Sequence, residues 1–149
     1  FNGQENEIPA HILETFHKNK WPYLIMDIAL ELGAADLSEE ERISLGLPEK
    51  SELDVLIQST YKLLGLITFL TSGPKETRAW TVKEGSKAPE AGRVIHSDFA
   101  DKFIKAEVVN WGKLLEAGSW SLARQKGWIQ LEGKEYIVQD GDVIIFKHG

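Results

Sequence analysis

The sequence predicts an α+β fold, in which a mainly helical first half precedes a second half of short strands. Three observations carry this prediction. Helix-start and helix-stop signals are concentrated before Gly65, and runs rich in β-branched and aromatic residues follow it. The pair Asp140-Gly141, a strong tight-turn signal, separates two of these runs. With 42% apolar and 27% charged residues among 149, the composition is that of a packed globular chain.

Two helices are expected before residue 50. Apolar residues at 8, 12, 13 and 16 recur at helical spacing, so a helix should begin near Pro9. Ser38 followed by Glu41 forms a capping box, and the short helix after it should end at Gly46. Between these helices, residues 23–26 are interpreted as a buried strand, with a core helix segment as the alternative.

A third helix is predicted for residues 51–64. Ser51 is the expected N-cap, and Gly65 is positioned to end the helix. Its apolar side chains fall on one helical stripe. They are Leu53, Leu56, Ile57, Tyr61 and Leu64.

Six strands are predicted after Gly65. They cover residues 66–71, 77–82, 103–109, 128–131, 136–138 and 143–146. Ser72-Gly73-Pro74 should be the turn that joins the first two into a hairpin. One helix is expected to pack on one face of these strands.

Short helices and one loop should separate these strands. A loop is expected over residues 83–91, because the segment holds Gly85 and Pro89. A short helix should follow with Ser97 as its N-cap. Another should be capped by Asn110 and end at Gly118, with Leu114 and Leu115 pointing inward. A last helical segment is expected over residues 119–126, closed by Gly127.

Several classes of function are excluded or disfavoured by what the sequence lacks. Without cysteine there is no disulfide, zinc-thiolate site or cysteine nucleophile. No apolar run reaches the ~20 residues of a membrane span, and no secretory signal is recognisable. There is no G-x-x-x-x-G-K-[ST] loop, so the chain by itself should not hydrolyse a nucleotide. Because residue 1 is Phe, we expect a processed chain or a fragment of a longer protein.

Charge divides the chain into two unlike halves. The net charge is −6, which argues against a simple nucleic-acid binder, and no DNA partner is expected. Residues 1–70 hold 5 Lys or Arg against 12 Asp or Glu, whereas residues 71–149 hold 12 against 11. Any contact with RNA phosphates therefore belongs to the second half.

The histidines do not predict a metal site, because none has the spacing of a ligand pair. His96 with Asp98 is the one pair that suggests acid–base chemistry. The alternative is structural, since a carboxylate at Asp98 favours the first turn of a helix. We weigh the structural role above the catalytic one and predict no catalytic residue.

Basic residues alternate with Trp80 and Phe99 between residues 75 and 105. Basic side chains beside exposed aromatic rings can bind the backbone and bases of RNA. A solvated surface of mixed charge is the alternative, because acidic residues share the segment. The basic residues are Lys75, Arg78, Lys83, Lys87, Arg93, Lys102 and Lys105. All except Lys75, together with His96, are the predicted RNA- or partner-binding residues.

A series of ordered motifs gives a more specific indication. They occupy residues 63–69, 73–76, 78–81, 94–99, 103–108, 131–138 and 140–144, with Gly85 and Ala88-Pro89 between them. In this order and spacing they resemble the C-terminal part of the YchF family of Obg-like ATPases. Residues 28–32 and 37–42 resemble, less closely, the loop that closes the nucleotide site in that family and the helix after it.

The resemblance implies a TGS domain, a ubiquitin-like β-grasp module, over residues 65–149. It also implies a connecting helix over residues 51–64 and a remnant of a P-loop α/β nucleotide-binding domain over residues 1–50. In the family, a P-loop domain that uses ATP and Mg²⁺ lies upstream, and the proteins associate with ribosomes in the cytoplasm. No cofactor is expected in this chain itself. Ile28, Ala29, Leu30 and Glu31 would lie next to the nucleotide of the full-length protein.

Two functions of different class remain open. The chain is expected to be a regulatory or docking module whose partner is the ribosome, RNA or the upstream nucleotide-binding domain of an ATPase. The alternative is a stand-alone ubiquitin-like binding or carrier protein without nucleotide chemistry. Sulfur carriers of that kind act through a Gly-Gly tail, whereas this chain ends in Lys147-His148-Gly149.

Overall fold

The computed structural model describes residues 1–73 and 76–149, which form two compact units, Phe1–Thr60 and Tyr61–Gly149. Each unit is described by itself. The predicted turn at Ser72-Gly73-Pro74 lies partly outside the described residues, and so does Lys75. Within the described ranges, no helix is long and apolar enough to cross a bilayer.

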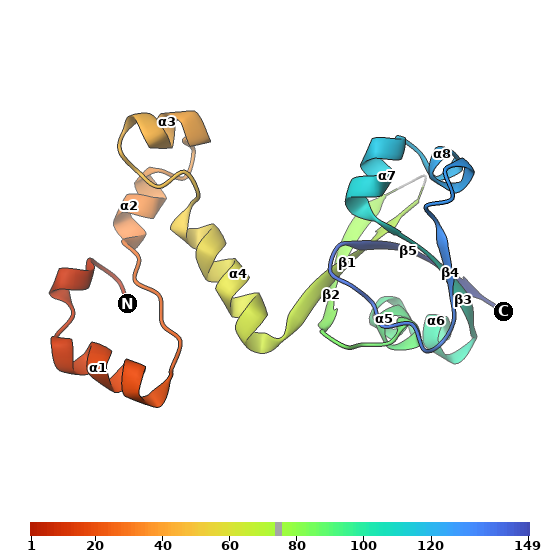
Figure 1. The fold of residues 1–149 in the computed structure, drawn as a ribbon, viewed down its shortest axis with the longest axis horizontal. Helices are drawn as coiled ribbons and strands as arrows, with labels where there is room; N and C mark the ends of the chain where they lie inside the picture. The colour runs from red at the N-terminus through yellow and green to blue at the C-terminus, as the bar shows by residue number, and fades with distance from the viewer. Residues whose placement is uncertain (74–75) are drawn as a thin grey trace. The chain divides into compact units, whose positions relative to one another are not determined.

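The first unit consists of short helices connected by irregular chain (Figure 1). They are η1 (Glu5–Glu7), α1 (Ala10–Asn19), α2 (Ile28–Gly33), α3 (Glu39–Ser44) and the first part of α4 (Glu52–Leu64). The helix caps predicted at Ser38 and Ser51 are confirmed. Ser38 accepts from Glu41 N and Glu41 accepts from Ser38 N, which is a complete capping box, and Ser51 Oγ accepts from Leu53 N at 3.1 Å. Gly65 ends α4 with φ +60°, a conformation that glycine adopts without strain.

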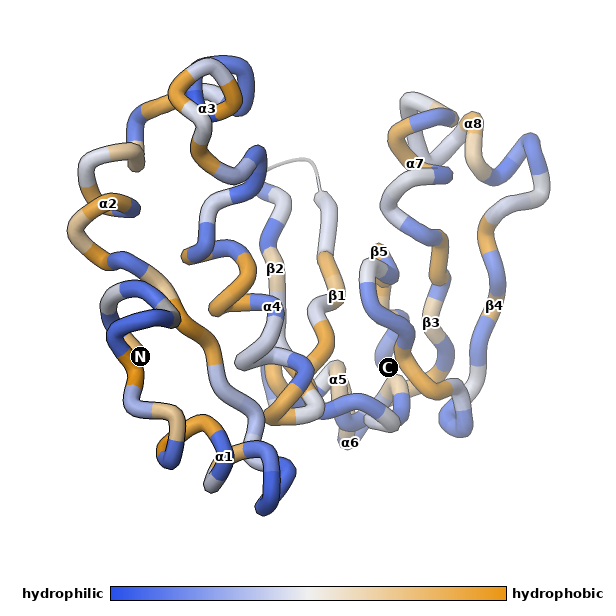
Figure 2. Tube along the Cα trace, turned by 60° about the vertical axis from the view of Figure 1, so that its left-hand side comes forward, coloured by the Kyte–Doolittle hydropathy of each residue, from blue (hydrophilic) through white to orange (hydrophobic). Residues whose placement is uncertain are grey.

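The buried strand predicted for residues 23–26 is wrong. These residues are only half-buried, and the only ladder contact there is an isolated bridge between Met26 and Asn2. A strand needs a partner along its length, whereas this segment has backbone hydrogen bonds only at Leu24 and Met26, with Phe1 and Gly3, among the described residues. Exposed apolar side chains recur along α2 and α4, where the tube in Figure 2 is orange.

The second unit contains a five-stranded mixed sheet with the order β2-β1-β5-β3-β4. The strands are β1 (Leu66–Ser72), β2 (Thr77–Lys83), β3 (Phe103–Asn110), β4 (Gln130–Glu132) and β5 (Asp142–His148). The predicted hairpin is confirmed, because β1 and β2 pair antiparallel along their whole length, from Leu66↔Lys83 to Ser72↔Thr77. β1 and β5 run parallel in the middle of the sheet, and β3 pairs antiparallel with both β5 and β4.

Helices lie on both sides of this sheet rather than on one (Figure 1). α5 (Ala88–Ile95) and α6 (Ser97–Asp101) cover one face, and α7 (Trp111–Ala117) and α8 (Trp120–Gln125) lie on the other. The core forms between the sheet and α5, because alternate strand residues point to this face. Its fully buried members include Phe69, Ala91, Ala106, Val108 and Ile144.

Helix α5 replaces the last four residues of the loop predicted for residues 83–91. Pro89 suggested a break, but it lies in the first turn of the helix, where its missing N–H is not needed. The Glu90 carboxylate accepts a hydrogen bond from Lys87 N at 2.8 Å, which satisfies a backbone donor at the N-terminus of the helix. The next helix is also displaced by one residue from its prediction. Its cap is His96, whose Nδ1 accepts from Asp98 N at 3.2 Å, and not Ser97.

The strand predicted for residues 136–138 does not form. Tyr136 O accepts from Ala88 N, and Val138 N donates to Ser86 O, so the segment pairs with the turn before α5. Similarly, only Gln130 and Leu131 of the strand predicted for 128–131 lie in β4, which is three residues long. A neighbour distant in sequence, rather than local propensity, decides both segments.

The turn predicted at Asp140-Gly141 is present directly before β5, and it is hydrogen-bonded to β1. Thr68 N donates to Asp140 Oδ1 at 2.8 Å, and Gly141 N donates to Thr68 O at 2.8 Å. Of the two leucines expected to point inward from α7, Leu114 is half-buried and Leu115 is 71% exposed. The interpretation of Leu115 was wrong, and the buried side chain of this short helix is Ala117.

Candidate functional site

The predicted nucleotide-adjacent residues form the first turn of α2. Asp27 caps this helix, because its Oδ1 accepts from Leu30 N at 3.0 Å, and Asn2 Oδ1 accepts from Ile28 N at 3.1 Å. Two of the amides that a phosphate would need are therefore already bonded within the protein. Ile28 and Leu30 are 54% and 48% exposed and present apolar side chains.

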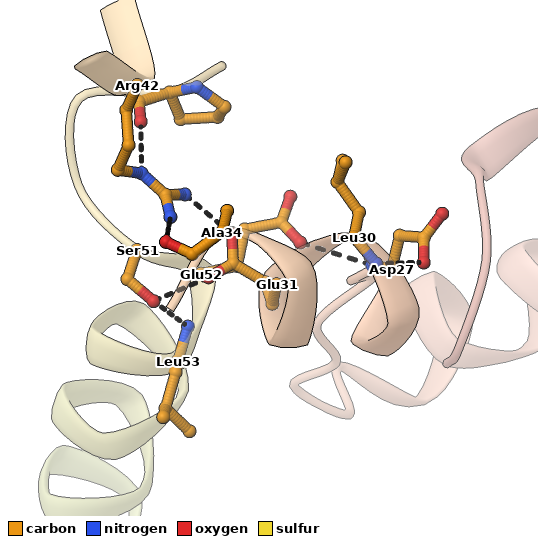
Figure 3. Close-up of polar contacts among 9 residues, drawn as sticks. Asp27, Leu30, Glu31, Ala34, Arg42, Ser51, Glu52 and Leu53 are labelled. Atoms are coloured by element: carbon orange, nitrogen blue, oxygen red, sulfur yellow. Dashed lines mark hydrogen bonds and ion pairs between the residues drawn. The ribbon is translucent and has the colours of Figure 1, made fainter. Parts of the chain in front are cut away.

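Glu31 differs from its neighbours, because its carboxylate is buried in a polar cluster (Figure 3). Arg42 Nη2 donates to Glu31 Oε1 at 2.7 Å, and Ser51 Oγ donates to Glu31 Oε2 at 2.6 Å. The guanidinium also donates to Pro48 O and Ala34 O, so it connects α3 to α2 and to the loop before α4. The Glu31 side chain is 9% exposed and the Arg42 side chain is 5% exposed. The pair is therefore a buried ion pair that stabilises the first unit.

A hollow of about 510 Å³ lies beside this cluster, wholly within the first unit. Four acidic residues line it (Glu31, Glu39, Glu49 and Asp54), against two basic residues, Arg42 and Lys50. Arg42 is already neutralised by Glu31. A polyphosphate would meet net negative charge there, so these residues do not fit a nucleoside triphosphate. The described residues also contain no group of side chains suited to hold a metal ion.

The Glu31 cluster makes the stability of the first unit depend on pH. The hydrogen bond from Ser51, opposed by burial and supported by Arg42, holds the pKa of Glu31 below its ordinary value of 4.5. The folded pKa is below the unfolded one, so the stabilisation is complete above the unfolded value and is lost as pH falls through the folded value.

We expect amide exchange in residues 28–51 to be slower at pH 7 in the wild type than in Glu31→Gln, and the two proteins to converge as the pH falls below 4.5 and Glu31 becomes protonated. Comparison at equal pH removes the intrinsic pH dependence of exchange. A difference that persists unchanged at pH values where carboxylates are protonated would show that the carboxylate charge is not the cause.

Three of the predicted RNA-binding cations are engaged in ion pairs on the second unit. Lys87 Nζ lies 2.6 Å from Glu135, Arg93 Nη2 lies 2.9 Å from Asp101, and Lys102 Nζ lies 3.5 Å from Asp98. The contact with Glu135 raises the pKa of Lys87. His96 is used as a helix cap, so its Nδ1 accepts a hydrogen bond from the backbone and is not directed at Asp98's carboxylate. The α5–α6 side of the sheet is therefore close to electrically balanced.

Arg78, Lys83 and Lys105 have no ion-pair partner among the described residues, but they do not share one location. The Arg78 guanidinium lies 4.4 Å from the centre of the Trp80 ring, a cation–π contact. Lys83 pairs with Leu66 at the beginning of β1, which is parallel to β5, whereas Lys105 pairs with Lys147 near the end of β5. Lys83 and Lys105 thus lie at opposite ends of the sheet.

Three further charged residues, which the sequence motifs do not indicate, lie near Lys105. Glu107, Arg124 and Lys147 converge beside it from β3, α8 and β5. Successive side chains of a strand point to opposite faces of the sheet. Because Ala106 and Phe146 are buried in the core, their neighbours Lys105 and Lys147 point to the opposite face. This alternation was readable in the sequence, but the arrival of Arg124 from a separate helix was not.

Comparisons with known proteins relate the whole chain to one group. Residues 66–149 match the family model YchF-GTPase_C, described as a protein of unknown function (DUF933). Ribosome-binding ATPase YchF of Bacillus subtilis (strain 168) is 45% identical over 146 residues, covering 95% of this chain and 40% of that protein. Obg-like ATPase 1 of Xenopus laevis is 39% identical over 149 residues, covering 97% of this chain and 37% of that protein.

A solved structure agrees with these sequence matches. The Schizosaccharomyces pombe YchF GTPase superposes with a TM-score of 0.78 at 31% identity, covering 92% of this chain and 37% of that chain. The mixed α+β architecture is thus similar to the C-terminal region of that protein. The chain spans about two fifths of the length of the relatives it matches. Because the family model covers more than half of the chain, the chain belongs to the YchF-GTPase_C family.

Proposed function

We propose that this chain is the C-terminal region of a YchF/Obg-like ATPase and that residues 65–149 form a β-grasp TGS module that docks on the ribosome. The match to a relative named as a ribosome-binding ATPase, over 95% of the chain at 45% identity, carries the proposal. In this proposal, hydrolysis of ATP with Mg²⁺ belongs to an upstream P-loop domain, and the protein acts in the cytoplasm.

The strand arrangement supports the module assignment. A hairpin comes first, the last strand lies parallel to the first in the middle of the sheet, and helices connect β2 to β3 and β3 to β4. This is the connectivity expected for a β-grasp module. Residues 1–50 would then be the remnant of the nucleotide-binding domain, and 51–64 the connecting helix. The relatives favour this function over a stand-alone carrier protein, because both named sequence matches are ATPases.

Ribosome binding by the chain should be electrostatic and sensitive to salt. The net charge is −6, so attraction to ribosomal RNA must come from local groups of cations in the second unit. We expect the chain to sediment with purified ribosomes through a sucrose cushion at about 50 mM salt and to be released progressively toward about 200 mM, as phosphate contacts are exchanged for counterions.

The control is the chain centrifuged alone, which should remain in the supernatant. Ribosomes stripped of loosely bound factors by a high-salt wash exclude indirect binding through such a factor. If no sedimentation with washed ribosomes occurs at any salt concentration, the docking function is wrong.

A further inference from the structure

Four charged residues form a basic cluster on the second unit: Lys105, Glu107, Arg124 and Lys147. Arg124 Nη2 lies 2.9 Å from Glu107 Oε2, and Lys147 Nζ lies 3.9 Å from the same oxygen. The Glu107 side chain is only 12% exposed, whereas Arg124 and Lys147 are 62% and 44% exposed. One largely buried carboxylate therefore anchors two cations that remain accessible to a partner.

Lys105 adds a third cation that this carboxylate does not neutralise. It is the register partner of Lys147 on adjacent antiparallel strands, and both side chains point away from the core. Like charges placed directly opposite each other in a sheet are destabilising. The cluster thus holds three positive charges around one negative charge, an arrangement that folding alone does not favour.

The other side of the sheet provides a contrast. There Lys87, Arg93 and Lys102 each lie beside a separate acid, Glu135, Asp101 and Asp98. Their charges are compensated within the protein, so they offer less attraction to an anion. The basic cluster combines residues of β3, β5 and α8, and its three cations face a single acid among the described residues, so two positive charges stay unbalanced there.

We propose that the basic cluster binds the phosphate backbone of RNA. This inference rests on the proposed ribosome-docking function and names the surface and the ligand class. Consecutive phosphates carry closely spaced negative charges, which three neighbouring cations can neutralise together. The Arg124 guanidinium can donate to phosphate oxygens while it remains bonded to Glu107, because it carries five N–H donors. RNA binding would also relieve the repulsion between Lys105 and Lys147.

The test measures binding of a fluorescein-labelled single-stranded oligouridylate to the whole chain by fluorescence anisotropy. Lys105→Gln/Lys147→Gln removes two charges at nearly constant side-chain length. We expect it to weaken binding about tenfold and to reduce the salt slope by about 1.4, since each single-strand phosphate contact contributes roughly 0.7. The variant should fold at least as well as the wild type, because a repulsion is removed.

Lys87→Gln/Lys102→Gln is the matched control, because it changes the net charge equally on the opposite side of the sheet. We expect its affinity to stay within about twofold of the wild type. Glu107→Gln can still accept from Arg124 but lacks the negative charge, so it should bind about two- to threefold more tightly. A gain of affinity cannot arise from misfolding. Equal losses in both double variants, or no loss in either, would overturn the inference.

Sedimentation with ribosomes separates this inference from the proposed function. If the wild type binds ribosomes and Lys105→Gln/Lys147→Gln binds them equally well, docking stands and the basic cluster is not its RNA contact. If ribosome binding is lost while oligouridylate binding is unchanged, the partner is an acidic protein surface and the RNA assignment is wrong. If only the oligouridylate is bound, and the basic cluster governs that binding, the inference holds and ribosome docking fails.

Discussion

Replacing Phe69 with alanine should lower the free energy of unfolding of the second unit by about 3–5 kcal/mol. Phe69 is fully buried on β1, and its ring makes an edge-to-face contact with Phe146 at a centroid distance of 6.0 Å. The substitution removes the ring from the centre of the sheet, and the surrounding strands can only partly close the cavity. Loss of the aromatic contact adds to this cost.

Urea denaturation followed by segment-resolved hydrogen exchange would measure this change in residues 61–149 separately from the first unit. Leu115→Ala is the control, because this side chain is 71% exposed and its truncation should alter stability by less than about 0.5 kcal/mol. If Phe69→Ala and Leu115→Ala had equal effects, the core described here would be wrong.

Arg42→Ala should destabilise the first unit by about 3–5 kcal/mol, because it leaves Glu31 as a buried carboxylate without its counter-charge. The same substitution removes donors from Pro48 O and Ala34 O. Because this guanidinium connects α3 to α2 and to the loop before α4, we expect loss of helical circular dichroism and rapid proteolysis within residues 28–51.

The matching control removes both charges. Arg42→Met/Glu31→Met should recover much of the stability lost in Arg42→Ala, since an apolar pair of similar volume replaces the buried ion pair. The coupling measured by such a double-mutant cycle reports the interaction itself. If Arg42→Ala resisted protease as well as the wild type, the cluster would not support the first unit.

Local signals predicted most of the helix ends. The capping box at Ser38, the cap at Ser51 and the stop at Gly65 each depend on residues within four positions of one another, so their hydrogen bonds are encoded locally. The hairpin of β1 and β2 was predictable for the same reason, because the two strands are adjacent in sequence. The resemblance to the YchF family, read from the motifs between residues 63 and 144, is confirmed by the comparisons.

Partners distant in sequence explain the errors. Residues 136–138 have strand propensity, but their hydrogen bonds go to Ser86 and Ala88, about fifty positions away. Residues 23–26 lack a neighbouring strand altogether within the described first unit. At Pro89 the error was one of position, since proline ends a helix in its interior but is accommodated in its first turn.

At the candidate site, too, local features could be predicted from the sequence and contacts between distant residues could not. The sequence located the basic residues in the second half, but it could not assign their acidic partners, because Lys87 and Glu135 are 48 positions apart. Nor could it show that Glu31 is used internally, because Arg42 and Ser51 approach it from two other helices. Only the folded chain reveals which cations are compensated.

Taken by itself, the sequence determined the family, the α+β character, the absence of a P-loop and the excess of basic residues after residue 70. The tertiary structure alone decided which of those basic residues keep an uncompensated charge. Register between β3 and β5 sets Lys105 beside Lys147, and packing of α8 brings Arg124 to Glu107. Helix and turn signals act over a few residues, whereas electrostatic balance depends on side chains that only folding brings together.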